Sequence, residues 1–88
     1  EGVDPAPGTD MTLTIKQGTT MDELAKTLEE YGVIDDTTVF KVQSYVYNVK
    51  SIEPGTYIFN TSKSGEDLFE VIKEGPQENK EKEETQEQ

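Results

Sequence analysis

The sequence predicts an α+β fold, in which a two-stranded antiparallel sheet packs against helices in the chain order β-α-α-β-α. Three observations carry this prediction. Apolar and polar residues alternate near the start of the chain, capping signals precede apolar residues at helical spacing, and a second apolar run follows a Pro-Gly turn. Together these features span residues 11–75 and contain no internal repeat.

The first strand is predicted over Met11–Lys16. Met11, Leu13 and Ile15 fall on one face, whereas threonines and a lysine fall on the other. This alternation is typical of a strand with one buried face. Gly18 marks the end of the strand.

The first helix is predicted to begin after Thr20. Thr20 and Glu23 have the spacing of a capping box, in which each side chain accepts a hydrogen bond from the other residue's backbone N–H. The residues expected to face the core recur at helical spacing, and they are Met21, Leu24, Ala25 and Leu28. Gly32 is placed to close the helix in the left-handed conformation.

The second helix is predicted over about residues 37–47, with Asp35 or Asp36 as its cap. The stretch is rich in β-branched and aromatic residues, which favour a strand. The helical interpretation depends on apolar residues that recur at i, i+3, i+7 and i+10. These residues are Val39, Val42, Val46 and Val49, and Phe40 and Tyr47 add an i, i+7 pair beside them.

The second strand is predicted over Thr56–Asn60, directly after a Pro-Gly turn signal. The third helix is predicted to begin after Ser64, a preferred N-cap residue, and to end at Gly75. Its apolar face is expected to contain Leu68, Phe69, Val71 and Ile72.

Charge and apolar residues divide the 88-residue chain into three parts. The net charge is −11, from 19 acidic and 8 basic residues. Residues 1–10 carry −3 and have the proline and glycine content of a flexible linker, which we expect to be extended and not to pack. Residues 76–88 also carry −3 and have no apolar side chain, so a disordered acidic tail is predicted. Residues 11–75 form the predicted domain.

The composition excludes several classes of function. A net charge of −11 repels nucleic-acid phosphates, so no nucleic-acid partner is expected. Because the chain has no Cys or His, thiolate metal sites and Cys or His catalysis are excluded, and no cofactor or metal is expected. No apolar run reaches the roughly 18 residues that span a bilayer. Solvated helix faces and caps explain three adjacent acidic pairs better than glycosidase chemistry does: Glu29-Glu30, Asp35-Asp36 and Glu66-Asp67.

The order and spacing of these elements resemble a known module. Residues 14–34 (TIKQGTTMDELAKTLEEYGVI) look like the opening strand, turn and helix of a LysM module, and residues 51–59 (SIEPGTYIF) look like its closing strand. The resemblance is closer to the LysM-like domain of the YceG-like family, the endolytic murein transglycosylases of the MltG type. It covers residues 11–75, and the residues that carry it are Ile15, Gly18, Leu24, Ala25, Leu28, Gly32, Val33, Ile34, Phe40, Ile52, Gly55, Tyr57, Phe59, Ser64, Asp67, Leu68, Phe69 and Gly75.

The resemblance implies a small LysM-like β-α-α-β core with a C-terminal helix, together with a glycan-binding surface. In LysM modules two loops, here Lys16–Met21 and Asn48–Tyr57, lie side by side and hold N-acetylated sugars through backbone groups and apolar contacts. The glycan-binding residues implied in this way are Gln17, Gly18, Thr19, Thr20, Ile52, Pro54, Gly55 and Tyr57. Turn and capping chemistry alone also explains them. Three tyrosines would either stack on sugar rings or pack in the core: Tyr45, Tyr47 and Tyr57.

YceG-like transglycosylases carry a larger catalytic domain, with a catalytic glutamate, after this module, and residues 76–88 do not resemble it. We therefore expect no catalytic residue and no enzymatic activity in this chain. The resemblance implies a non-catalytic module that binds or localises to peptidoglycan glycan strands. It would be extracytoplasmic, at the bacterial cell surface, and tethered to the membrane by a segment upstream of Glu1. The alternative is a protein–protein interaction module of a cell-envelope complex that binds no sugar.

Overall fold

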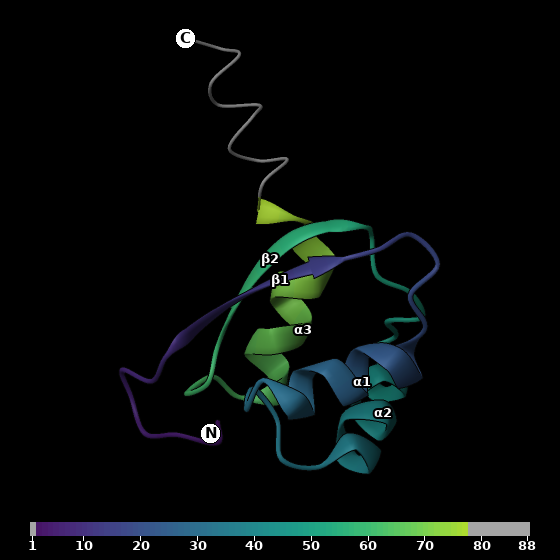
Figure 1. Cartoon of the computed structure of the whole chain (residues 1–88). Helices are drawn as coiled ribbons and strands as arrows, with labels where there is room; N and C mark the ends of the chain where they lie inside the picture. The colour runs from purple at the N-terminus through teal and green to yellow at the C-terminus, as the bar shows by residue number, and fades with distance from the viewer. Residues whose placement is uncertain (1, 78–88) are drawn as a thin grey trace, which may run out of the picture.

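The computed structural model describes residues 2–77, and its elements confirm the predicted α+β fold and element order. Strands β1 (Asp10–Ile15) and β2 (Gly55–Asn60) pair antiparallel, with Asp10 opposite Asn60 and Ile15 opposite Gly55. In the view of Figure 1 the two strands run across the top of the domain, with helices α1 and α2 below them and α3 crossing behind. None of the helices within residues 2–77 has the length and hydropathy to cross a membrane.

The sheet buries one face, as the alternation in the sequence predicts. Leu13 and Ile15 of β1 are buried, and Leu13 lies opposite Tyr57 in the register. The rings of Tyr57 and Phe59 on β2 are fully buried and stack with their centroids 5.7 Å apart. These side chains form the sheet's share of the hydrophobic core.

Helix α1 (Met21–Glu30) begins and ends by the predicted chemistry. Glu23 N donates to Thr20 Oγ1 at 3.1 Å and Thr20 N donates to Glu23 Oε1 at 3.0 Å, which completes the capping box. At the other end Gly32 has φ 77°, and Val33 N donates to Leu28 O at 2.9 Å. This Schellman turn points Val33 into the core, where it is 1% exposed.

Helix α2 (Thr37–Val46) begins at Asp36, one of the two predicted caps, and of the two apolar sets in its sequence the recurring valines are the ones left exposed. Val39, Val42 and Val46 are 49%, 55% and 72% exposed. The helix instead buries Phe40 and Ser44. It turns this other side inward because the Phe40 ring stacks on Phe69 at 4.6 Å, a larger apolar contact than a valine offers.

Helix α3 (Gly65–Glu74) matches the prediction at both ends. Ser64 Oγ accepts from Asp67 N at 3.3 Å, and Gly75 follows the helix with φ 94°. Leu68, Phe69 and Ile72 are buried in the core.

The residues on either side of the predicted domain depart from the sequence-based expectation. Residues 1–10 are predicted not to pack, yet Gly2 N donates to Ser62 O at 3.1 Å and Asp4 N donates to Thr61 O at 3.0 Å. Thr9 N adds a bond to Thr61 Oγ1 at 2.8 Å. Backbone groups of the 60–62 turn thus supply partners that composition does not reveal.

The predicted tail also begins later than its composition suggests. Pro76 is buried, and a β-carbon placed on Gly55 would lie 2.5 Å from Pro76 Cβ, so the proline ring packs directly on the start of β2. The predicted disorder of the remaining tail falls on residues 78–88, which lie outside the described residues.

Candidate functional site

The two loops implied by the resemblance meet at a cavity between the start of α1 and the end of α2. The cavity has a volume of about 290 Å³, and we call it the Tyr45 cavity. Met21 comes from the first loop, and Asn48, Val49 and Lys50 come from the second. The full lining is Met21, Asp22, Lys41, Ser44, Tyr45, Asn48, Val49 and Lys50.

A turn at the end of α2 places the second loop on this cavity. Asn48 adopts a left-handed conformation with φ 59°, which is rare for residues other than glycine but tolerated by asparagine. Asn48 N donates to Tyr45 O at 3.1 Å and Val49 N donates to Ser44 O at 2.8 Å, so the turn has the Schellman pattern. Val49 is buried as a result, while Lys50 emerges beside the helix end.

Tyr45 is the most exposed large apolar residue of the described chain, at 84%. Its ring borders a cavity that also offers the Met21 thioether and the amide of Asn48. A largely apolar platform with a few polar groups at its edge is the usual composition of a small-ligand site. From the sequence, Tyr45 was one of three tyrosines that would stack on a sugar or pack in the core. Its position on the face of α2 opposite Phe40 distinguishes it from the two tyrosines that pack in the core.

The other two tyrosines belong to the core. Tyr47 is half-buried, with its ring 5.5 Å from that of Phe69. Tyr57 is 0% exposed, and its hydroxyl donates to Glu53 O at 2.6 Å. Burial, and secondarily the nearby Glu53 carboxylate, raises the pKa of Tyr57 to about 12. Tyr57 is therefore a packing residue, and its buried ring offers no exposed face on which a sugar could stack.

The eight residues implied by the resemblance differ widely in exposure, and their role in glycan binding stays a prediction. Ile52 is 7% exposed and packs in the core beside Tyr57. Thr20 is occupied by the capping box, and Gly55 lies against Pro76. Pro54 is exposed beside it at the end of the sheet.

The remaining three residues of that set lie on a shallow groove between the end of β1 and α1. Gln17, Gly18 and Thr19 line this groove, whose volume is about 600 Å³, together with Thr14, Ile15, Lys16, Glu23, Lys26, Thr27 and Glu30. Thr19 Oγ1 donates to Lys16 O at 2.7 Å, so its hydroxyl already serves the turn. Gly18 has φ 85°, a left-handed conformation that favours glycine, so the turn alone explains this residue without any role in binding.

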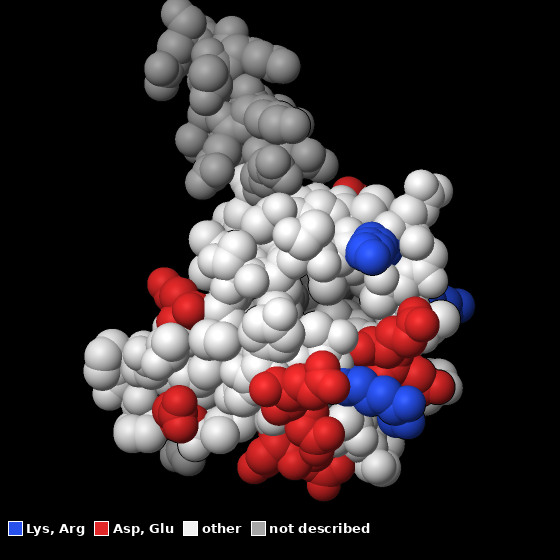
Figure 2. All heavy atoms as spheres, viewed as in Figure 1, with Lys and Arg blue, Asp and Glu red and all other residues white. Residues whose placement is uncertain are grey.

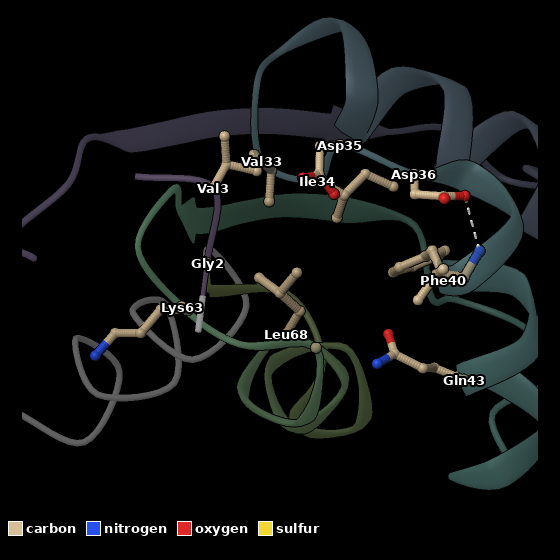
Figure 3. Close-up of a pocket in the computed structure, with 12 residues that line it drawn as sticks. Gly2, Val3, Val33, Ile34, Asp35, Asp36, Phe40, Gln43, Lys63 and Leu68 are labelled. Atoms are coloured by element: carbon tan, nitrogen blue, oxygen red, sulfur yellow. Dashed lines mark hydrogen bonds between the residues drawn. The ribbon is translucent and has the colours of Figure 1, made fainter. Parts of the chain in front are cut away.

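A third cavity, of about 240 Å³, lies where the N-terminal segment crosses the helices (Figure 3). Two of its polar side chains contact the rest of the fold, because Asp36 Oδ1 accepts from Val39 N at 3.1 Å and the Gln43 amide lies against Gly65. Figure 3 shows Val3 above this cavity, on the segment that was predicted not to pack. We interpret the cavity as a packing gap between the N-terminal segment and the helices, and not as a ligand site.

No group of three or more possible metal ligands lies together within residues 2–77. The acidic side chains gather instead on the surface, and Figure 2 shows them over α1 and the loop that follows it. These exposed carboxylates are solvated. Asp22 and Glu23, in the first turn of α1, also interact favourably with the positive end of the helix dipole.

Comparison with known proteins agrees with this architecture. The model of the YceG-like family matches residues 13–87. A crystal structure of a YceG-like protein from Listeria monocytogenes superimposes with a TM-score of 0.70 at 18% sequence identity. That match covers 76% of this chain and 22% of the Listeria chain, so the chain spans under a quarter of that protein's length. A search of curated proteins finds no match.

Proposed function

Because the chain belongs to the YceG-like family, we propose that it is a non-catalytic, LysM-like cell-envelope module that binds peptidoglycan glycan strands at the Tyr45 cavity. The observation that carries the proposal is the 84% exposed ring of Tyr45, bordering a cavity where both implied loops meet. The C–H face of a pyranose ring packs on an aromatic ring, and its hydroxyl and acetamido groups take hydrogen bonds from neighbouring polar groups.

The lining supplies both kinds of contact. Met21 and the Tyr45 ring present apolar surface, while Asn48 presents an amide with two donors and one acceptor group. The Ser44 hydroxyl donates to Lys41 O at 2.6 Å, which leaves its oxygen as an acceptor. A neutral N-acetylated sugar thus finds a platform and hydrogen-bonding partners within a volume of about 290 Å³.

A binding role without catalysis is supported by where the carboxylates lie. Every Asp and Glu side chain within residues 2–77 belongs to an exposed residue. A glycosidase acid needs an apolar pocket that keeps it protonated, opposite a second carboxylate across the glycosidic bond. We extend the proposal to the location expected from the resemblance: an extracytoplasmic module, tethered to the bacterial membrane through a segment upstream of Glu1.

The proposal is tested by titrating the ¹⁵N-labelled chain with chitotetraose and following the amide signals. We expect shifts at Met21, Asn48 and Val49 and weaker binding by Tyr45→Ala. The matched control is Tyr31→Ala, which removes a 45% exposed tyrosine that lines no part of the cavity. Unchanged spectra with chitotetraose and with peptidoglycan fragments alike would rule out glycan binding.

The second candidate function is a protein–protein interaction module of a cell-envelope complex. It is favoured by one observation, the exposed valines of α2, since Val39, Val42 and Val46 form an apolar stripe open to solvent. Crosslinking from a photoreactive residue at position 42 in the cell envelope distinguishes the two candidates. A defined protein adduct at that position, with no glycan shifts, would favour the interaction module.

A further inference from the structure

The Tyr45 cavity carries an excess of positive side chains on a protein that is strongly acidic. Two lysines, Lys41 and Lys50, and one carboxylate, Asp22, line it, whereas the whole chain has a net charge of −11. Lys41 Nζ lies 3.2 Å from Asp22 Oδ1, so these two charges largely neutralise each other. That is the only ion pair found among the described residues, which leaves Lys50 without a carboxylate partner within 4.0 Å there.

The backbone does not alter this balance. The first turn of α1 and the last turn of α2 both reach the cavity, through Met21 and Tyr45. A helix carries partial positive charge at its N-terminus and partial negative charge at its C-terminus, so the two contributions oppose each other. The sign of the local field is therefore set by the side chains, and the unpaired one is Lys50.

We propose that the Tyr45 cavity selects a sugar that carries a carboxylate, with the pyranose ring on Tyr45 and the carboxylate at Lys50. This inference rests on the proposed function and narrows it to the muramyl sugar of peptidoglycan. A muramyl residue differs from N-acetylglucosamine by a lactyl ether whose carboxylate is either free or joined to a stem peptide. The stem peptide has carboxylates of its own, so one chemistry has two sources.

The surrounding acidity sharpens this selection. Charges farther away than about 10 Å are screened at moderate ionic strength, so a bound carboxylate experiences Lys50 more strongly than the distant acids. An anionic glycan strand placed elsewhere on this acidic surface is repelled, whereas a neutral glycan strand experiences no net electrostatic force there. Lys50 thus fixes both the preference for a carboxylate and the position of the strand.

The test compares four oligosaccharides of equal length by amide-shift titration of the full 88-residue chain. They are chitotetraose, the N-acetylglucosamine–muramic acid repeat with free lactyl carboxylates, the same repeat with those carboxylates reduced to alcohols, and the repeat with stem peptides. We expect a carboxylate-bearing ligand to bind about 2- to 5-fold more tightly than the neutral ones, which is the size of an exposed ion pair. The advantage should vanish in about 1 M sodium chloride, where the Debye length is about 3 Å.

Two variants locate the effect. Lys50→Gln should remove the preference for the carboxylate, so that the anionic ligand binds the variant no more tightly than chitotetraose does. The matched control, Lys73→Gln, removes the same charge from an exposed residue in the last turn of α3 and should keep the preference. Both substitutions are on exposed side chains, and an unchanged amide spectrum of the free variant confirms that it folds.

Each outcome decides one of the two proposals. Preference for the free lactyl form assigns the carboxylate to the sugar, and preference for the stem-peptide form alone assigns it to the peptide. Equal binding of the neutral and anionic ligands, or a preference that survives Lys50→Gln, overturns the inference while the glycan-binding function stands. Failure of all four ligands to bind removes the proposed function itself.

Discussion

The buried hydroxyl of Tyr57 makes the stability of this domain depend on alkaline pH in a way that one substitution should reveal. Tyr57 is 0% exposed, and its hydroxyl donates to Glu53 O at 2.6 Å. Tyr57→Phe removes this hydrogen bond and keeps the ring. We expect the free energy of unfolding at neutral pH to fall by about 0.5–1.5 kcal/mol, the net value of one hydrogen bond.

The pH dependence has a definite sign. Burial raises the pKa of Tyr57 from 10.0 to about 12, so between these values the unfolded chain loses the phenolic proton before the folded one does. The folded state then binds more protons than the unfolded state, and stability falls as pH rises. The free energy of unfolding should therefore fall by about 2 kcal/mol between pH 10 and 12. Below pH 10 this contribution is fully retained.

The assay is urea unfolding followed by circular dichroism, on the natural chain and Tyr57→Phe, at neutral pH and at steps from about pH 9 to 12. Because the phenylalanine variant lacks the titrating group, its stability should fall less steeply, and the order of the two proteins should reverse near the top of the range. Tyr31→Phe, at a 45% exposed position, is the control and should follow the natural chain. A difference between the natural chain and Tyr57→Phe that stays constant with pH would refute the reasoning.

Three further predictions concern the fold. Thr20→Ala removes the capping-box acceptor of Glu23 N and should cost about 1 kcal/mol in chemical unfolding, whereas the same change at exposed Thr12 should not remove a cap. Phe40→Ala should cost about 3–5 kcal/mol, while Val42→Ser should change stability by less than about 0.5 kcal/mol; the reverse order would contradict the packing of α2. Gly55→Ala should lower the thermal midpoint, because residue 55 has φ 140° and its new β-carbon would meet Pro76; an unchanged midpoint would show that this contact is dispensable.

The elements were predictable from the sequence because their signals are local. The capping box of α1, the serine cap of α3 and the glycine that closes each of these helices all lie within a few residues of what they control. The strands followed from alternation, and their bounds in the structure differ from the prediction by one residue at most. For the helix ends, neighbouring residues alone determine the capping hydrogen bonds that form.

Two features could not be predicted from the sequence, because they depend on residues far away along the chain. Residues 2–9 look like a linker by composition, yet their backbone groups bond to the turn at 60–62, about 50 residues away. Pro76 follows a helix stop and precedes the low-complexity tail, yet it is buried against Gly55. A local pattern carries no information about which remote groups will meet it.

The exposure of the α2 valines and the exposure of Tyr45 have one physical cause. Recurring valines and recurring Phe40, Ser44 and Tyr47 both satisfy helical periodicity, and burial of the aromatic rings against Phe69 decides between them. Successive residues are about 100° apart around a helix, so Tyr45 lies about 140° from Phe40. Once the aromatic side faces the core, Tyr45 must therefore project outward, as its 84% exposure shows.

The same choice of face makes the cavity possible. If the valines were buried, Val49 would have to continue their stripe along the helix; instead it is buried through the left-handed turn at Asn48, which ends the helix at Val46. That turn leaves Lys50 lining the same cavity as Tyr45. The proposed aromatic platform and its cation are thus a consequence of how the core is packed, so Asn48→Ala should disturb glycan binding as well as stability. Binding by a folded Asn48→Ala variant with unchanged affinity, measured by the same chitotetraose titration, would show that the turn is not needed to place them.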